Sequence, residues 1–180
     1  MSTALRKVSA APGSEKAREA SIDDSPEVRP LADKATTRLI LTGLRAIGAL
    51  ALIAMGALHL QQYYDAGYSA IPTIGTLFVL NFVGGVALGL ALLLPLERLP
   101  GRAGTVAVPL LAFTGAAMAA TAFVFLLISQ QTPVFGWLET AKTSAIPAAL
   151  YSEAVATVAL AIVAAASAVS SRPRHLRPAL

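Results

Sequence analysis

The chain has 180 residues, of which 56% are hydrophobic and only 13% are charged, with a formal net charge of +4. A chain so apolar and so poor in charge is not an ordinary soluble domain. The basic residues of the N-terminal region are mixed with acidic ones and form no basic arm, so we expect no nucleic-acid partner. The lack of cysteine excludes disulfides, thiolate metal sites and thiol catalysis.

In chain order, residues 1–36 are rich in Ala, Ser, Pro and alternating charge, and we expect them to form a disordered tail. Four apolar runs follow. Each is long enough to cross a hydrocarbon layer of about 30 Å as an α-helix. The sequence therefore predicts an all-α fold, a four-helix transmembrane bundle in residues 37–170, followed by a basic tail, residues 171–180. The expected spans are about 38–63, 72–94, 106–129 and 147–170.

The distribution of positive charge predicts the orientation of the spans. Basic residues precede the first span, lie between the second and third, and follow the fourth, whereas the other two loops hold only Lys142. Because Lys and Arg accumulate in cytoplasmic loops, we expect a multi-pass protein of the cell membrane with both termini cytoplasmic. Aromatic residues favour the headgroup region, and six of them gather at the opposite, outer boundary: Tyr63, Tyr64, Tyr68, Phe135, Trp137 and Tyr151.

Small residues at helical spacing predict which faces of the spans meet. Helices in lipid associate through close packing of small residues and through a few polar contacts. On the second span, Asn81 and two glycines follow one another at i, i+4 and i+8, and Glu153 lies on the small-residue face of the fourth. We therefore expect Asn81 and Glu153 to point into the bundle. The predicted helix-packing residues are Gly85, Gly89, Gly115 and Ala119.

Three polar side chains fall in the outer half of the spans or near the midplane: His59, Asn81 and Glu153. Ionisable groups at such depth are usually paired, neutralised or functional. One interpretation is that the three fix the bundle through interhelical hydrogen bonds. The other is a site open to the outer surface, for a small ligand, a lipid headgroup or a quinone-like molecule. The ligand-binding residues would then be His59, Tyr63, Tyr64, Asn81 and Glu153.

We expect no metal and no cofactor. Met55 and His59 are four residues apart and could share a copper ion, but two ligands fall short of a complete metal site. No hydrolase, kinase or dinucleotide-binding motif is present, so we expect no catalytic machinery.

The function class remains open between two hypotheses. The first is a non-enzymatic component of the lipid bilayer that acts through a membrane-protein partner or a homo-oligomer. The alternative is a protein that binds or transports a small molecule, a lipid or protons, with its site around His59, Asn81 and Glu153.

Residues 59–81 also carry a resemblance to known proteins, through His59-Leu60, Tyr64, Tyr68, the Ile-Pro-Thr-Ile-Gly segment 71–75 and the run to Asn81. In these residues the chain resembles small four-span bacterial membrane proteins of unassigned function, which implies a fold and no activity. In size, span count and its Gly-rich second helix it is similar, more loosely, to the DoxX-like membrane proteins. That similarity would imply partnership with redox or thiol-handling proteins, in which a chain without cysteine takes no direct part.

Overall fold

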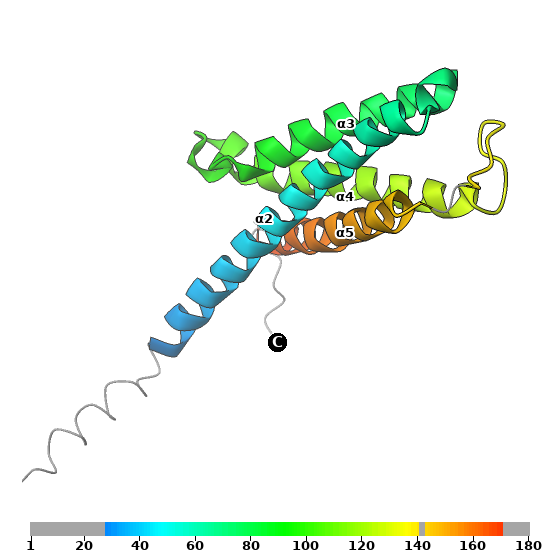
Figure 1. Cartoon of the computed structure of the whole chain (residues 1–180). Helices are drawn as coiled ribbons and strands as arrows, with labels where there is room; N and C mark the ends of the chain where they lie inside the picture. Colours follow the sequence, from blue (N-terminus) through cyan, green and yellow to red (C-terminus); the bar gives the residue numbers. More distant parts are fainter. Residues whose placement is uncertain (1–27, 141–142, 171–180) are drawn as a thin grey trace, which may run out of the picture. The chain divides into compact units, whose positions relative to one another are not determined.

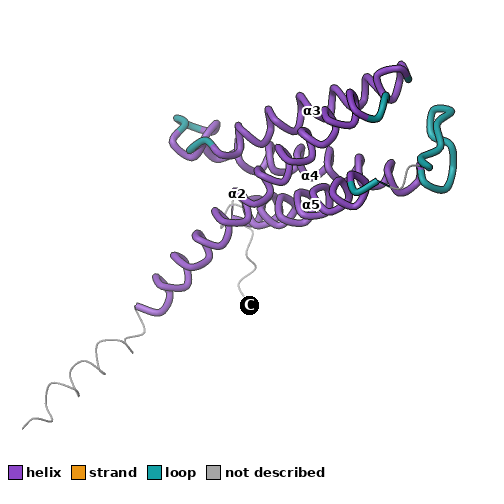
Figure 2. Tube along the Cα trace, viewed as in Figure 1, coloured by secondary structure: helices purple, strands orange, loops and turns teal. Residues whose placement is uncertain are grey.

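The structure is a computed structural model, and it describes residues 28–140 and 143–170. These residues form four long α-helices and two short 3-10 turns, and no strand occurs among them (Figure 1). Figure 2 shows short connections after α2 and α3 and a longer loop between α4 and α5. The elements in order are α2 (Val28–Asp65), η1 (Tyr68–Ala70), α3 (Pro72–Leu93), η2 (Leu96–Arg98), α4 (Arg102–Ser129) and α5 (Ala145–Ser170).

Each of the four helices is long and apolar enough to cross a membrane. The predicted all-α, four-helix transmembrane fold is therefore confirmed, and the chain has the helices of an integral membrane protein. The expected tail segments at residues 1–27 and 171–180 lie outside the described residues.

The main difference from the predicted boundaries is at the start of the first helix. α2 begins at Val28 rather than near Arg38, so residues 28–36, predicted to be disordered, are helical. The segment contains Ala, Leu and Lys, which are good helix formers, and Pro30 falls in the first turn, where a missing N–H does no harm. α4 likewise begins at Arg102 rather than near Val106, and it continues through Pro109.

The chain divides into two units, Met1–Ile40 and Leu41–Leu180. In the first unit the described residues, 28–40, are helical, and the side chains from Asp33 to Ile40 are exposed. The second unit contains the remainder of α2 and the other three helices.

The core of the second unit is built mainly from small side chains. Ala112, Ala116 and Ala119 of α4 are buried, as are Ala156 and Val163 of α5. The largest fully buried side chains are few: Leu52, Met55, Leu92, Leu160 and Glu153. Since lipid cannot drive helices together through the hydrophobic effect, such small residues allow the close approach that gives van der Waals attraction.

The backbones of α2 and α3 meet where α3 carries glycine. A Cβ atom added at Gly85 would lie 2.7 Å from the carbonyl oxygen of Leu52, and one at Gly89 would lie 2.7 Å from that of Ala49. At Gly115 of α4, an added Cβ would instead meet the side chains of Leu52 and Leu160. All four residues predicted to pack helices are buried: Gly85, Gly89, Gly115 and Ala119.

Candidate functional site

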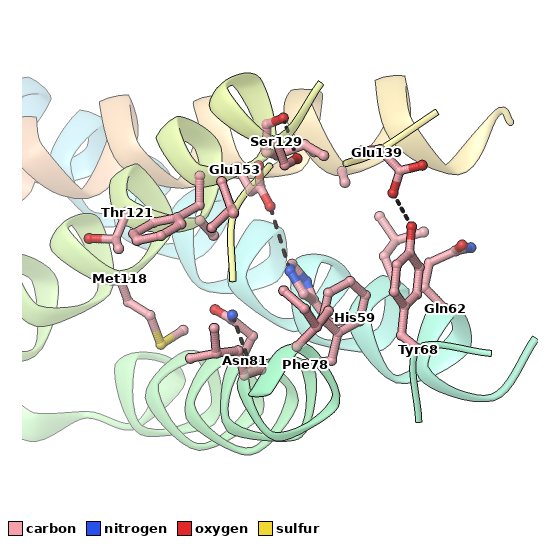
Figure 3. Close-up of a pocket in the computed structure, with 18 of the residues that line it drawn as sticks. His59, Gln62, Tyr68, Phe78, Asn81, Met118, Thr121, Ser129, Glu139 and Glu153 are labelled. Atoms are coloured by element: carbon pink, nitrogen blue, oxygen red, sulfur yellow. Dashed lines mark hydrogen bonds and ion pairs between the residues drawn. The ribbon is translucent and has the colours of Figure 1, made fainter. Parts of the chain in front are cut away.

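A cavity of about 640 Å³ lies among the four helices, toward the end of the bundle that carries η1. Its volume is within the range of pockets that bind small molecules. The wall is largely apolar and aromatic, and a few polar side chains project into it (Figure 3). The polar residues come from different elements and include His59 and Gln62 from α2, Tyr68 from η1, Asn81 from α3, Thr121 and Ser129 from α4, Glu139 from the loop before α5, and Glu153 from α5.

Glu153 is the most deeply buried polar residue that lines the cavity. It is fully buried, and neither carboxyl oxygen has a hydrogen-bond partner among the described residues. The closest polar contact is with His59, whose Nε2 lies 3.8 Å from Oε1, and Figure 3 shows the two side chains pointing toward one another. This distance exceeds that of a good N–H···O hydrogen bond, about 3.2 Å at most. The helices thus bring the two groups together without closing a hydrogen bond.

The orientation of the His59 ring determines which nitrogen carries its proton. Nδ1 lies 2.9 Å from the carbonyl oxygen of Met55, one turn earlier on α2. Because a carbonyl oxygen only accepts, Nδ1–H is the donor, and in the neutral imidazole Nε2 is left as an acceptor facing the cavity. The ring edge also contacts Phe78, with the ring centroids 4.9 Å apart.

Met55 takes part in this arrangement through its backbone. Its side chain belongs to the buried hydrophobic core, while its carbonyl oxygen accepts from His59. No group of three His, Asp or Glu side chains suited to a metal ion occurs among the described residues.

Asn81 lines the same cavity as His59 and Glu153. Its Nδ2 donates to the carbonyl oxygen of Leu77, 3.1 Å away on the same helix. This bond fixes the orientation of the amide, because only the NH2 group can donate, and leaves Oδ1 as an acceptor. The three polar residues predicted within the spans therefore share one cavity.

The two tyrosines predicted to join them do not line the cavity. Tyr64 is 70% exposed. Tyr63 is half-buried, and its ring contacts that of Tyr64 edge to face, with the centroids 5.0 Å apart. Because consecutive residues of a helix point in directions about 100° apart, Tyr64 faces a different side of α2 from His59. Tyr63 shares the side of His59 but lies one turn further along the helix, beside Gly75.

Sequence reasoning missed a second polar contact, between Tyr68 and Glu139. The phenol of Tyr68 is buried and donates a hydrogen bond to the carboxylate of Glu139, in the loop between α4 and α5 (Figure 3). Its ring stacks on Phe78 with the centroids 4.6 Å apart. Burial, together with the hydrogen bond and charge of Glu139, raises the pKa of Tyr68 well above its ordinary range. Tyr68 therefore remains a neutral donor at physiological pH.

Trp137, which also lines the cavity, is positioned by a tight turn of residues 134–137. Val134 and Trp137 exchange two backbone hydrogen bonds of 2.8 and 2.9 Å. The central residues, Phe135 and Gly136, have φ values of 51° and 79°, as a two-residue hairpin turn requires. The indole packs edge to face on Tyr68, with the centroids 5.8 Å apart. Tyr68 and Trp137, which the sequence places only at the outer membrane boundary, are thus part of the cavity wall.

No protein-family model, curated protein or solved structure matches this chain. The resemblance to small four-span bacterial proteins, and the looser one to the DoxX-like group, stay predictions.

Proposed function

We propose that this integral membrane protein binds a small, largely apolar molecule with one polar group in the cavity between its four helices. The observation that carries the proposal is an apolar cavity of about 640 Å³ into which His59, Asn81 and Glu153 project. Ligand sites combine such an apolar wall with a few polar groups that fix orientation.

Burial of Glu153 supports a ligand over a purely structural role. A carboxyl group removed from water without hydrogen bonds is costly, whether it is neutral or charged. A structural glutamate would be expected to bond to a neighbouring helix, yet both oxygens of Glu153 are unpartnered among the described residues. A ligand with a polar group placed beside it offsets this cost.

We further propose that both termini face the cytoplasm and that the η1 end of the bundle, with the cavity, lies in the outer half of the membrane. The support is the charge distribution: Arg98 ends η2 and Arg102 begins α4 at the opposite end, whereas in the sequence the segments 66–71 and 130–144, which connect the helices at the η1 end, contain Lys142 as their single Lys or Arg. The first hypothesis, a non-enzymatic component working through a membrane-protein partner or a homo-oligomer, stays a prediction and is compatible with ligand binding.

The cavity contains its own reporter, because Trp137 is the single tryptophan of the chain. The test is a titration of the purified protein in detergent with 4-bromobenzyl alcohol, a neutral aromatic molecule whose bromine quenches tryptophan fluorescence on contact. We expect saturable quenching with one molecule bound per chain. Quenching that rises linearly, without saturation, would contradict the proposal.

Two neighbouring alanines of α5 supply matched variants. Ala149 lines the cavity and is half-buried, whereas Ala148 is exposed and does not line it. Ala149→Phe fills part of the cavity and should abolish the saturable phase, while Ala148→Phe should retain it. Circular dichroism of both variants checks that the helices are intact. Equal quenching in the two folded variants would place the binding outside the cavity.

A further inference from the structure

We infer that the ligand is an organic amine in its cationic form, carried on an aromatic or alkyl body, and that Glu153 is its counter-ion. This inference rests on the proposed function and adds the chemical class of the ligand. It follows from three features of the cavity: its charged residues, the hydrogen-bonding roles that its polar atoms have left, and its aromatic wall.

The charged side chains of the cavity favour a cation. Among the described residues that line it are two carboxyl groups, Glu139 and Glu153, and no Lys or Arg. Glu139 already accepts a hydrogen bond from Tyr68. Glu153 is therefore the carboxyl group on which the inference depends. Lys142, in the loop between α4 and α5, lies outside the described residues.

Among the polar side chains that line the cavity, His59, Asn81 and Glu153 have acceptors left, whereas Trp137 has a donor, its indole N–H. His59 uses Nδ1–H on the carbonyl of Met55, which leaves Nε2 with a lone pair in the neutral ring. Asn81 uses its amide NH2 on the carbonyl of Leu77, which leaves Oδ1. Glu153, when ionised, has acceptors alone. Three side chains from three helices therefore offer acceptors to one cavity, and a ligand rich in N–H donors complements them.

Two hydroxyl groups of α4 likewise have only acceptor capacity left. Thr121 donates to the carbonyl of Ala117 at 2.8 Å, and Ser129 donates to that of Leu126 at 2.9 Å. Because each hydroxyl has a single proton, both oxygens are left with lone pairs alone. A neutral ligand that brings only carbonyl oxygens, such as a quinone, would leave these acceptors and Glu153 unsatisfied.

The aromatic residues of the cavity wall also favour a cationic ligand. Tyr68, Phe78 and Trp137 line the cavity, and the face of an aromatic ring attracts a cation within about 6 Å of its centroid. Aromatic faces also pack well against an apolar ligand body. The wall thus suits both parts of a hydrophobic amine.

His59 alone does not satisfy the carboxyl group of Glu153. At 3.8 Å, Nε2 and Oε1 are near enough for electrostatic attraction but too far apart for a good hydrogen bond, so both carboxyl oxygens stay unsatisfied. An ammonium group carries up to three N–H donors on a compact charge and can reach both residues at once.

The test compares three probes of similar size that differ in charge: 4-bromobenzylamine, 4-bromobenzyl alcohol and 4-bromobenzoate. All are titrated at neutral pH, with quenching of Trp137 as the readout. We expect the amine to bind about tenfold more tightly than the alcohol, a ratio that corresponds to about 1.4 kcal/mol, and the benzoate to show no saturable binding.

Glu153→Gln removes the charge and nearly preserves the shape of the side chain. In this variant we expect the affinity for the amine to fall about tenfold, to that of the alcohol, because the amide oxygen of Gln still accepts a hydrogen bond but no longer carries the charge that strengthens it. Glu97→Gln is the matched control, because Glu97 is an exposed glutamate that pairs with Arg45 away from the cavity. It should leave the amine affinity unchanged.

The outcomes separate the inference from the proposed function. If amine and alcohol bind the wild-type protein with equal affinity, the inference of a cationic ligand is wrong, although the cavity still binds an apolar ligand. This comparison uses the wild type alone and therefore holds even if Glu153→Gln does not fold. Tighter binding of the benzoate would make His59 the charged group and overturn the inference. Absence of saturable quenching by all three probes would overturn the proposed function as well.

Discussion

The two halves of one face of α3 have different surroundings: one half lines the cavity and the other contacts the backbone of α2. Toward its start, the face carries Ile74, Phe78 and Asn81, which line the cavity. Toward its end, it carries Gly85 and Gly89, where the backbone of α3 approaches that of α2 so closely that a Cβ atom would overlap a carbonyl oxygen. Within about two turns, the same face of α3 thus changes from a cavity wall to a close contact with the backbone of α2.

The comparison shows how a bundle in lipid is both held together and kept open. Where side chains are absent, backbones touch and gain packing attraction, as small residues permit. Where a ring or an amide stands on the same face, a space is left that polar groups can line. The glycine half of α3 should therefore respond to substitution as a structural contact, and the other half as a binding surface.

The largest effect on stability is expected from Gly85→Ala. The added Cβ would lie 2.7 Å from the carbonyl oxygen of Leu52, and a backbone atom cannot move aside cheaply. By the cost of overpacking, the free energy of unfolding should fall by about 1–3 kcal/mol. The measurement is denaturation in detergent followed by circular dichroism.

Gly43→Ala is the control, since nothing lies within 4 Å of a Cβ added there. Alanine is the better helix former, so this variant should be as stable as the wild type or slightly more stable. If both variants lost stability equally, the glycine half would not be the structural contact described above.

The face itself could be predicted from the sequence, but its division could not. Asn81, Gly85 and Gly89 recur at helical spacing, and periodicity is enough to place them on one face. Whether a given position meets a neighbouring backbone or a cavity depends on the side chains of the other helices. Asn81, in particular, bonds within its own helix rather than across the bundle.

An effect of similar size, but confined to one region, is expected from Tyr68→Phe, which tests the cavity half. The variant removes a hydrogen bond to a buried carboxylate, worth about 1–3 kcal/mol, from the contact between η1 and the loop before α5. Hydrogen exchange of the backbone around Glu139 should accelerate, while exchange near Gly85 should not change. Tyr64→Phe, at an exposed position, is the control and should alter neither region.

Tyr68 also predicts a dependence on alkaline pH. Its pKa is raised by burial first and by Glu139 second, so the folded protein holds the phenolic proton more tightly than the unfolded chain. The stabilising contribution is complete below about pH 10, the pKa of an unfolded tyrosine, and is lost as the pH rises above it. The difference in tyrosinate absorbance between the wild type and Tyr68→Phe measures the ionisation of Tyr68, which we expect well above the ordinary tyrosine range. Ionisation of Tyr68 within that ordinary range would contradict its burial.

The smallest effect is expected at the end of the bundle away from the cavity, where Arg45 of α2 pairs with Glu97 of η2. The Glu97 side chain is 59% exposed, and exposed ion pairs contribute about 0.2–1 kcal/mol. A double-mutant cycle with Arg45→Gln and Glu97→Gln should give a coupling energy in that range, reduced by added salt. A coupling larger than the effect of Gly85→Ala would mean that charge, rather than close packing, holds this end.

The cavity could be predicted only in part, for reasons that particular residues make clear. Hydropathy identified His59 and Glu153 because a polar group stands out in an apolar span. It could not identify Tyr68 and Glu139, which lie 71 residues apart in loops where polar residues are ordinary. Nor could it show that Tyr64, next to the polar turn, is directed away from the cavity.

The positions of His59 and Glu153 also set an order of assembly. His59 belongs to the first helix of the bundle and Glu153 to the last, and a chain is synthesised from its N-terminus. A nascent chain that has inserted only three helices has the imidazole and the amide but lacks the carboxylate. The proposed counter-ion therefore arrives with the fourth helix, and any molecule that depends on it stabilises only a chain in which all four helices have been inserted. Under the proposed function, binding is thereby linked to the insertion of α5 and separates four-helix bundles from chains that stop after α4.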